Sequence, residues 1–114
     1  MNEIHEFSAL LNRALSGDCI AMFEVGECFA SGDGVEKNVG TAIRWIKRAA
    51  DKGDIDSMFE LARCYCIGMG VMQDLSIARR WLQQAYDADD LTKSPPARSR
   101  AIRDDVSRLL MRYE

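Results

Sequence analysis

The chain has 114 residues, of which 47% are hydrophobic and only two are proline, and its formal net charge is −3. This length gives one domain, residues 1–114, with a modest core, and the hydrophobic share excludes a disordered tail. No run approaches the roughly 20 apolar residues of a membrane span, and acidic Glu3 and Glu6 stand where a signal peptide would carry basic residues. These features predict a cytoplasmic protein that contacts no membrane, with its four cysteines as free thiols.

The charge is unevenly distributed along the chain. Residues 1–90 carry a formal charge of −6, whereas residues 91–114 carry +3. Nucleic acids and anionic membranes both attract basic surfaces, so the acidic part argues against either as a target.

The first predicted element is an N-terminal capping helix over residues 2–16. Phe7, Leu10, Leu11 and Ala14 follow the spacing of one helical face there. We expect this face to cover the first of two internal repeats.

The repeats occupy residues 17–52 and 53–90. Shifting the chain by 36 residues aligns 14 of 36 positions as identities, without a gap. A period of this length is typical of helical repeat proteins.

The first helix of each repeat is predicted at residues 19–31 and 55–67. Asp18 and Asp54 precede these helices, where a carboxylate accepts hydrogen bonds from unpaired backbone N–H groups. A G-x-G-V turn follows each helix, at residues 32–35 and 68–71, because glycine permits the positive φ that reverses the chain.

The second helices are predicted at residues 38–52 and 74–88, with Asn38 and Asp74 as N-caps. Trp45 and Trp81 lie among alanines on the apolar face of these helices, and we expect both to be core residues. The Ser94-Pro95-Pro96 break then separates repeat 2 from a C-terminal capping helix over residues 97–114. The apolar positions of this last helix are Ile102, Val106, Leu109, Leu110 and Tyr113.

A single helix pair cannot bury its apolar face, so neighbouring pairs must stack. The pattern therefore predicts an all-α fold, a short right-handed α-solenoid of two helix-turn-helix repeats between two capping helices. A stack of this kind leaves two ends, which would allow a homodimer.

Residues 17–90 resemble the Sel1-like repeat family of TPR-like proteins. The likeness lies in Gly17-Asp18, in the small and aromatic positions through Phe29, in the G-x-G-V turn, and in Ala42-x-x-Trp45-x-x-x-Ala49-Ala50. The resemblance implies an adaptor or scaffold that holds another protein in a groove of stacked helices, and it implies no common catalytic site.

The polar stripe of the first helices is the predicted partner-binding surface, together with arginines of the last helix. If the first helices line the concave side of the stack, this stripe forms the floor of the groove. Its residues are Glu24, Glu27, Cys28 and Ser31 in repeat 1, Glu60, Arg63, Cys64 and Ile67 in repeat 2, and Arg98, Arg103 and Arg108 in the last helix.

The leading hypothesis is a protein–protein interaction module that is not an enzyme and needs no cofactor. Such a module would act as an adaptor, a scaffold or an inhibitor, for example a bacterial immunity protein that neutralises a toxin. One alternative is a thiol-dependent redox or metal-binding protein that uses Cys28, Cys64 and Cys66, although His5 is the only histidine. The other is nucleic-acid contact through the arginine-rich last helix.

Overall fold

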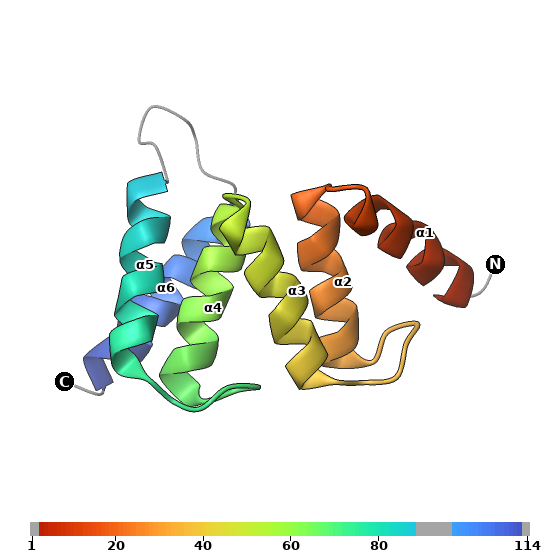
Figure 1. Ribbon diagram of the computed structural model, residues 1–114. Helices are drawn as coiled ribbons and strands as arrows, with labels where there is room; N and C mark the ends of the chain where they lie inside the picture. Colours follow the sequence, from red (N-terminus) through yellow and green to blue (C-terminus); the bar gives the residue numbers. More distant parts are fainter. Residues whose placement is uncertain (1–2, 89–96, 113–114) are drawn as a thin grey trace. The chain divides into compact units, whose positions relative to one another are not determined.

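The computed structural model describes residues 3–88 and 97–112, and this part of the chain is all helical (Figure 1). The chain divides into two compact units, unit 1 over Met1–Asp54 and unit 2 over Ile55–Glu114. No helix in the described part is long and apolar enough to cross a membrane. The helices are α1 (Glu3–Leu15), α2 (Cys19–Ser31) and α3 (Val39–Asp51) in unit 1, and α4 (Ile55–Ile67), α5 (Leu75–Ala88) and α6 (Ala97–Arg112) in unit 2.

The side chains predicted as N-caps hold the starts of α2 and α3 in unit 1. The carboxylate of Asp18 accepts hydrogen bonds from the backbone N–H groups of Ile20 and Ala21 at 3.0 and 3.2 Å. Asn38 Oδ1 accepts one from the N–H of Thr41 at 3.0 Å. These bonds satisfy donors that the first turn of a helix leaves unpaired.

The turn after α2 reverses the chain through a left-handed glycine. Gly32 has φ 79°, and the N–H groups of Gly32 and Asp33 both donate to the carbonyl of Cys28. The N–H of Asn38 then donates to the carbonyl of Phe29 at 2.8 Å. This closed turn starts α3 antiparallel to α2 and beside it.

A close approach of α2 and α3 at Gly26 forms the centre of unit 1. A Cβ atom added at Gly26 would lie 2.6 Å from Cγ1 of Ile46 and 3.0 Å from the carbonyl oxygen of Ala42. Glycine is therefore the residue that lets the two helices pack at this distance. The apolar face predicted for the second helix of repeat 1 is buried at Ala42, Ile46 and Ala49.

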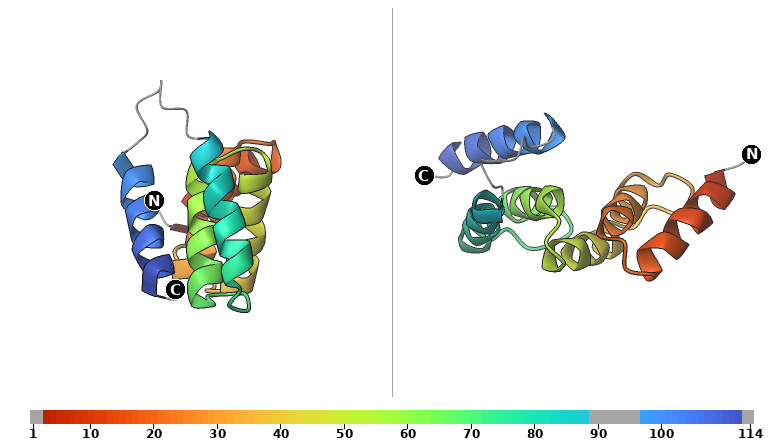
Figure 2. Two further views of the ribbon diagram at one scale, coloured as in Figure 1. Left: turned by 90° about the vertical axis from the view of Figure 1, so that its left-hand side faces the viewer. Right: turned by 90° about the horizontal axis from the view of Figure 1, so that it is seen from above.

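Helix α1 packs against α2 and crosses it obliquely (Figures 1 and 2). Phe7 of α1 meets Phe29 of α2 edge-on, with ring centroids 5.6 Å apart. Ala14, near the end of α1, is fully buried, as the predicted apolar face requires. The first helix thus covers the first repeat in the manner expected of a capping helix.

Unit 2 repeats the helical hairpin of unit 1 with α4 and α5. The N–H groups of Gly68 and Met69 donate to the carbonyl of Cys64, and the N–H of Asp74 donates to the carbonyl of Tyr65. Asp74 caps α5 by accepting from the N–H of Ile77 at 3.1 Å. Because these bonds match the turn after α2 position by position, the 36-residue repeat of the sequence is also a repeat of backbone structure.

Helix α6 completes the core of unit 2 and lies obliquely across the α4–α5 hairpin (Figure 2). Val106 and Leu110 of α6 are buried in a cluster with Ala62, Cys66 and Ala78 of the hairpin. The hydroxyl groups of Tyr86 and Ser107 lie 3.0 Å apart and are hydrogen-bonded. The apolar face predicted for this helix is confirmed at those two positions and at half-buried Leu109, while the side chains of Ile102 and Tyr113 and the Ser94-Pro95-Pro96 segment lie outside the described residues.

The two tryptophans lie at the margin of the core rather than inside it, which corrects the expectation from the sequence. Trp45 and Trp81 are both only partly buried. The guanidinium of Arg48 lies over the Trp45 ring, 4.9 Å from its centroid, and Trp81 packs against the outside of the unit 2 cluster. On α3 and α5, the helices that carry the tryptophans, alanines take the most deeply buried positions instead, namely Ala42, Ala49, Ala78 and Ala85.

Replacing Asn38 by alanine should lower the free energy of unfolding by about 1 kcal/mol, because Thr41 would lose its capping acceptor. Urea denaturation followed by circular dichroism measures this change. Asn38→Asp is the matched control and should stay near the wild type, since aspartate caps equally well. Equal losses in both variants would show that the side chain acts in some way other than capping.

Candidate partner-binding groove

A groove of about 660 Å³ lies between α1 and α2 in unit 1. It is formed by the first three turns of α1, the later part of α2 and the turn that follows α2. This volume falls in the range of ligand-binding sites. The lining residues are Glu6, Phe7, Ala9, Leu10 and Arg13 from α1, and Glu24, Glu27, Cys28, Ser31 and Asp33 from α2 and its turn.

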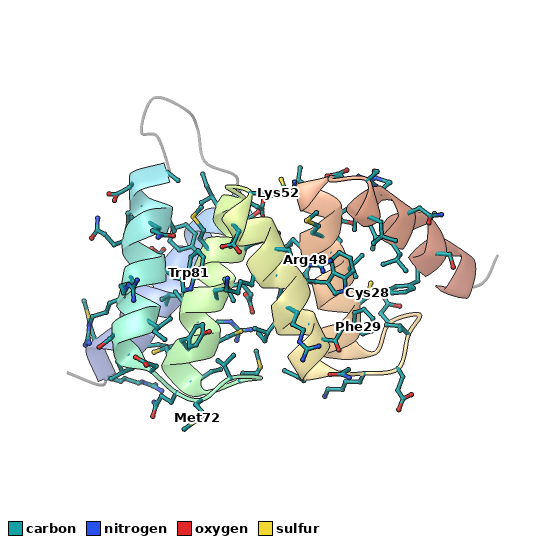
Figure 3. All side chains as sticks on the ribbon, viewed as in Figure 1. Cys28, Phe29, Arg48, Lys52, Met72 and Trp81 are labelled. Atoms are coloured by element: carbon teal, nitrogen blue, oxygen red, sulfur yellow. The ribbon has the colours of Figure 1, made fainter. Side chains whose placement is uncertain are left out.

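The oblique crossing of the two helices explains why the groove opens where it does. The short connection 16–18 holds the end of α1 close to the start of α2, and Ala14 and Ala21 are fully buried there. From that corner the helices diverge, as Figure 1 shows. The early part of α1 therefore faces the later part of α2 across an opening, and Figure 3 shows Cys28 and Phe29 on the side of α2 that faces α1.

The base of the groove is taken here as its half-buried lining residues, and three of these four residues are apolar, Glu24 being the fourth. Phe7, Leu10 and Cys28 line it and are half-buried, so each keeps part of its apolar surface accessible to a ligand. The edge-on contact with Phe29 fixes the ring of Phe7 in place. A preformed apolar floor of this kind offers surface for burial without prior rearrangement of the site.

Carboxylates surround the apolar base. Glu6, Glu24, Glu27 and Asp33 all line the groove, and Arg13 is the one basic residue among the lining residues. The guanidinium of Arg13 is already engaged, because it forms an ion pair of 2.9 Å with Asp18. The groove therefore presents a negative surface around apolar side chains.

The pKa of the Cys28 thiol reflects the negative charge of this surface. Its pKa is raised above the ordinary value of 9.0, first by burial and then by the nearby charges of Asp33, Glu27 and Glu24. A carboxylate raises the pKa of a thiol only by disfavouring the thiolate, so these three charges act together on the space around the sulfur.

Removing the carboxylates should make the thiol more acidic. In a Cys19→Ser background, we expect Glu24→Gln together with Glu27→Gln to move the pH midpoint of Cys28 alkylation by iodoacetamide downward, because both charges raise its pKa. Glu36→Gln is the matched control, since Glu36 is exposed but does not line the groove. An unchanged midpoint in the double variant would contradict the electrostatic picture.

Repeat 1 supplies the part of the predicted binding stripe that the structure brings together. Glu24, Glu27, Cys28 and Ser31 all line the groove. The equivalent residues of α4 are arranged differently. Arg63 donates hydrogen bonds to Glu60, Ile67 is exposed at the end of α4, and Cys64 is 1% exposed. Cys64 is thus a packing residue in this structure, and its sulfur is not available at the surface.

The arginines of the last helix contribute no groove that the structure describes. Arg98 and Arg103 belong to α6, but their side chains fall outside the described residues. Arg108 is exposed. Its role in binding stays a prediction.

The sequence predicts a binding role for four of the ten described lining residues. It places Phe7 and Leu10 on a packing face and Asp33 in a turn, and it assigns no role to Glu6, Ala9 and Arg13, although their spacing places them on one side of a helix. The helical spacing was the available signal. It does not reveal that this side faces α2, because that depends on the crossing angle of the two helices.

The thiol chemistry considered from the sequence finds little support in the geometry. The described cysteines are unbridged, and burial raises the pKa of Cys64 to about 12 and also raises the pKa of Cys66. A thiol nucleophile or redox centre needs the opposite shift, toward the thiolate. Within residues 3–88 and 97–112, no three cysteine, histidine or acidic side chains gather in a way that could hold a metal ion.

Comparison with known proteins places the architecture in a family. The Sel1 repeat matches residues 19–54 and again residues 55–90. The chain belongs to the Sel1 repeat family. The two matches coincide with the α2–α3 and α4–α5 hairpins to within a few residues, so α1 and α6 flank the Sel1 repeats. Sel1 repeats generally act as non-catalytic scaffolds that mediate protein–protein interaction.

Solved Sel1 structures share the fold. A Sel1 repeat protein from Oxalobacter formigenes and a protective antigen of uropathogenic Escherichia coli with an SLR fold each match at a TM-score of 0.73 and 24% sequence identity, over 78% of this chain. This chain spans 37% of the first protein and 19% of the second. No curated protein matches the sequence. The all-α repeat fold with flanking helices predicted from the sequence is thereby confirmed.

Proposed function

We propose that this protein is a non-catalytic interaction module that binds a segment of a partner protein in the groove between α1 and α2. The observation that carries the proposal is the groove itself, an opening of about 660 Å³ with an apolar base. Membership of a family whose repeats mediate protein–protein interaction supports a protein as the occupant.

The chemistry of the lining fits binding better than catalysis. The raised pKa of Cys28 favours the neutral thiol, and the lining residues that the structure describes include no histidine. The described carboxylates come from surface positions on α1, α2 and the turn, where charge guides recognition. We therefore expect an adaptor or an inhibitor that works by occupying its partner.

The effect of binding on the partner's activity distinguishes an inhibitor from an adaptor. A target enzyme or toxin whose activity falls when the protein binds would identify an inhibitor of the immunity type. A partner whose activity is unchanged, and which is brought to a third protein, would identify an adaptor. The unbridged cysteines fit a reducing compartment, so we propose the cytoplasm as the place where the complex forms.

Filling the groove tests the proposal. Ala9 is exposed and lines the groove, so Ala9→Trp should place an indole in the opening without disturbing the core. With a partner identified by affinity purification, calorimetry should show binding weakened by about tenfold or more, the loss expected when a central contact is blocked. Ser8→Trp adds the same side chain at the preceding position of α1, outside the lining, and should change the affinity by less than about twofold. Equal affinities in the two variants would place the binding surface elsewhere.

A further inference from the structure

We propose that the occupant of the groove is a basic segment of the partner, which inserts arginine or lysine side chains between the carboxylates of the rim and an apolar side chain against the base. This inference rests on the proposed function and adds the chemical class of the partner. The charges of the lining residues, the accessible apolar surface of the groove and the ion pair of Arg13 support this inference.

The balance of charge in the groove selects a cationic ligand. Among the described lining residues, Glu6, Glu24 and Asp33 carry carboxylates in addition to Glu27, which already interacts within the chain. The one guanidinium among these residues is bound to Asp18. An acidic segment would bring like charges together in a partly enclosed space, where their repulsion is less screened than in bulk water. A neutral segment would cover Glu6, Glu24 and Asp33 without offering them an opposite charge, which also costs free energy.

The carboxylates come from both sides of the groove. Glu6 projects from α1, whereas Glu24, Glu27 and Asp33 come from α2 and the turn after it. Three of these carboxylates, Glu24, Glu27 and Asp33, also lie near enough to the Cys28 thiol to raise its pKa further above the value that burial gives it. A cation bound there would interact with several carboxylates at once.

The apolar base favours a peptide segment over a lone cation. Phe7 and Leu10 keep accessible surface beside the carboxylates, and a small hydrophilic ion would leave that surface exposed. Arginine and lysine combine a charged head with an apolar stem, so they can satisfy both parts of the lining. The volume of about 660 Å³ has room for several side chains of one segment.

Selection from a random peptide library displayed on phage provides the test. The wild-type protein serves as bait, and the Ala9→Trp variant is used to discard peptides that bind outside the groove. Peptides that survive should be rich in arginine or lysine, with an apolar residue among them. Their binding should weaken as salt rises, because ion pairs near the surface are screened.

Charge variants then test the selected peptides by fluorescence anisotropy. Glu24→Gln should weaken binding by about two- to fivefold, the usual value of one partly exposed ion pair. Glu36→Gln makes the same change in net charge outside the lining and should leave the affinity within about twofold.

The outcomes separate the two proposals. Peptides that need the open groove but carry no basic residues would overturn the inference and keep the proposed function. Peptides that bind the wild type and Ala9→Trp equally, or no enriched peptides at all, would overturn both. Binding of spermine with the same dependence on Glu24, in the absence of peptide binding, would assign the groove to a small polyamine and overturn both as well.

Discussion

Replacing Phe59 by alanine should lower the free energy of unfolding by about 3–5 kcal/mol, the cost of removing a fully buried ring. Phe59 lies in α4, is 0% exposed, and meets the ring of Tyr86 edge-on at a centroid distance of 5.8 Å. Its loss would leave a cavity in unit 2 and would remove the contact that helps hold Tyr86. Urea denaturation monitored by circular dichroism measures the change.

A milder variant keeps this prediction testable if the alanine variant fails to fold. Phe59→Leu retains most of the apolar volume and should cost about 1–1.5 kcal/mol, as volume-conserving core changes do. Tyr86→Phe keeps the ring and removes only the hydroxyl that bonds Ser107, so its cost should be about 0.5–1.5 kcal/mol. A loss below about 1 kcal/mol in Phe59→Ala would show that the ring is not part of a tightly packed core.

Replacing Gly26 by alanine should destabilise the protein by about 1–3 kcal/mol through overpacking. The added methyl group would overlap Cγ1 of Ile46 and press on the carbonyl oxygen of Ala42. Neither can yield easily, because Cγ1 lies close to the backbone of a buried side chain and the oxygen is backbone itself. The helix propensity gained by replacing glycine, about 1 kcal/mol, offsets only part of the cost.

The same substitution at Gly40 is a matched control. Gly40 lies in α3, and a Cβ there would meet only Asn38 Oδ1 at 3.5 Å, which is an ordinary contact. Gly40→Ala should therefore stabilise the protein by up to about 1 kcal/mol through helix propensity alone. Opposite signs for the two variants would confirm the close helix crossing, whereas stabilisation in both would contradict it.

Repeat 2 has different residues at the corresponding contact between its two helices. The position of Gly26 is taken by Ala62, and that of Ile46 is taken by Leu82, which packs against the cluster containing Ala62. Isoleucine branches at Cβ and crowds the facing helix, whereas leucine branches one atom farther out and leaves room for a methyl group. We expect the two changes to compensate each other, with Leu82 leaving room for the methyl group of Ala62.

Much of the fold could be predicted because the residues that begin and end its helices act on neighbours close by in the sequence. Asp18, Asn38 and Asp74 cap the helices as expected, and Gly32 and Gly68 end α2 and α4 in the left-handed conformation. Caps and glycines act within a few residues of themselves, so a single sequence contains the information. A repeat doubles that information, since each signal occurs twice.

The sequence predicts some residues of the groove but not its place in the fold, because that place depends on how neighbouring helices cross. The predicted groove runs along the first helices of both repeats, whereas the groove in the structure lies between α1 and α2. The repeat pointed to Glu24, Glu27 and Cys28 as a shared stripe, and these residues do line the opening. The stripe was also expected to continue through Cys64, which is buried. Burial and crossing angle follow from how side chains interlock, and spacing along one helix does not determine them.

The position of α6 in the core of unit 2 has a consequence for synthesis on the ribosome. The helices of unit 1 are complete by residue 54, so its contacts can form while later residues are still being added. Unit 2 cannot close its apolar cluster until Val106 and Leu110 have emerged. Until then Ala62, Cys66 and Ala78 lack part of their cover, so the nascent second repeat exposes apolar surface to chaperones and to aggregation.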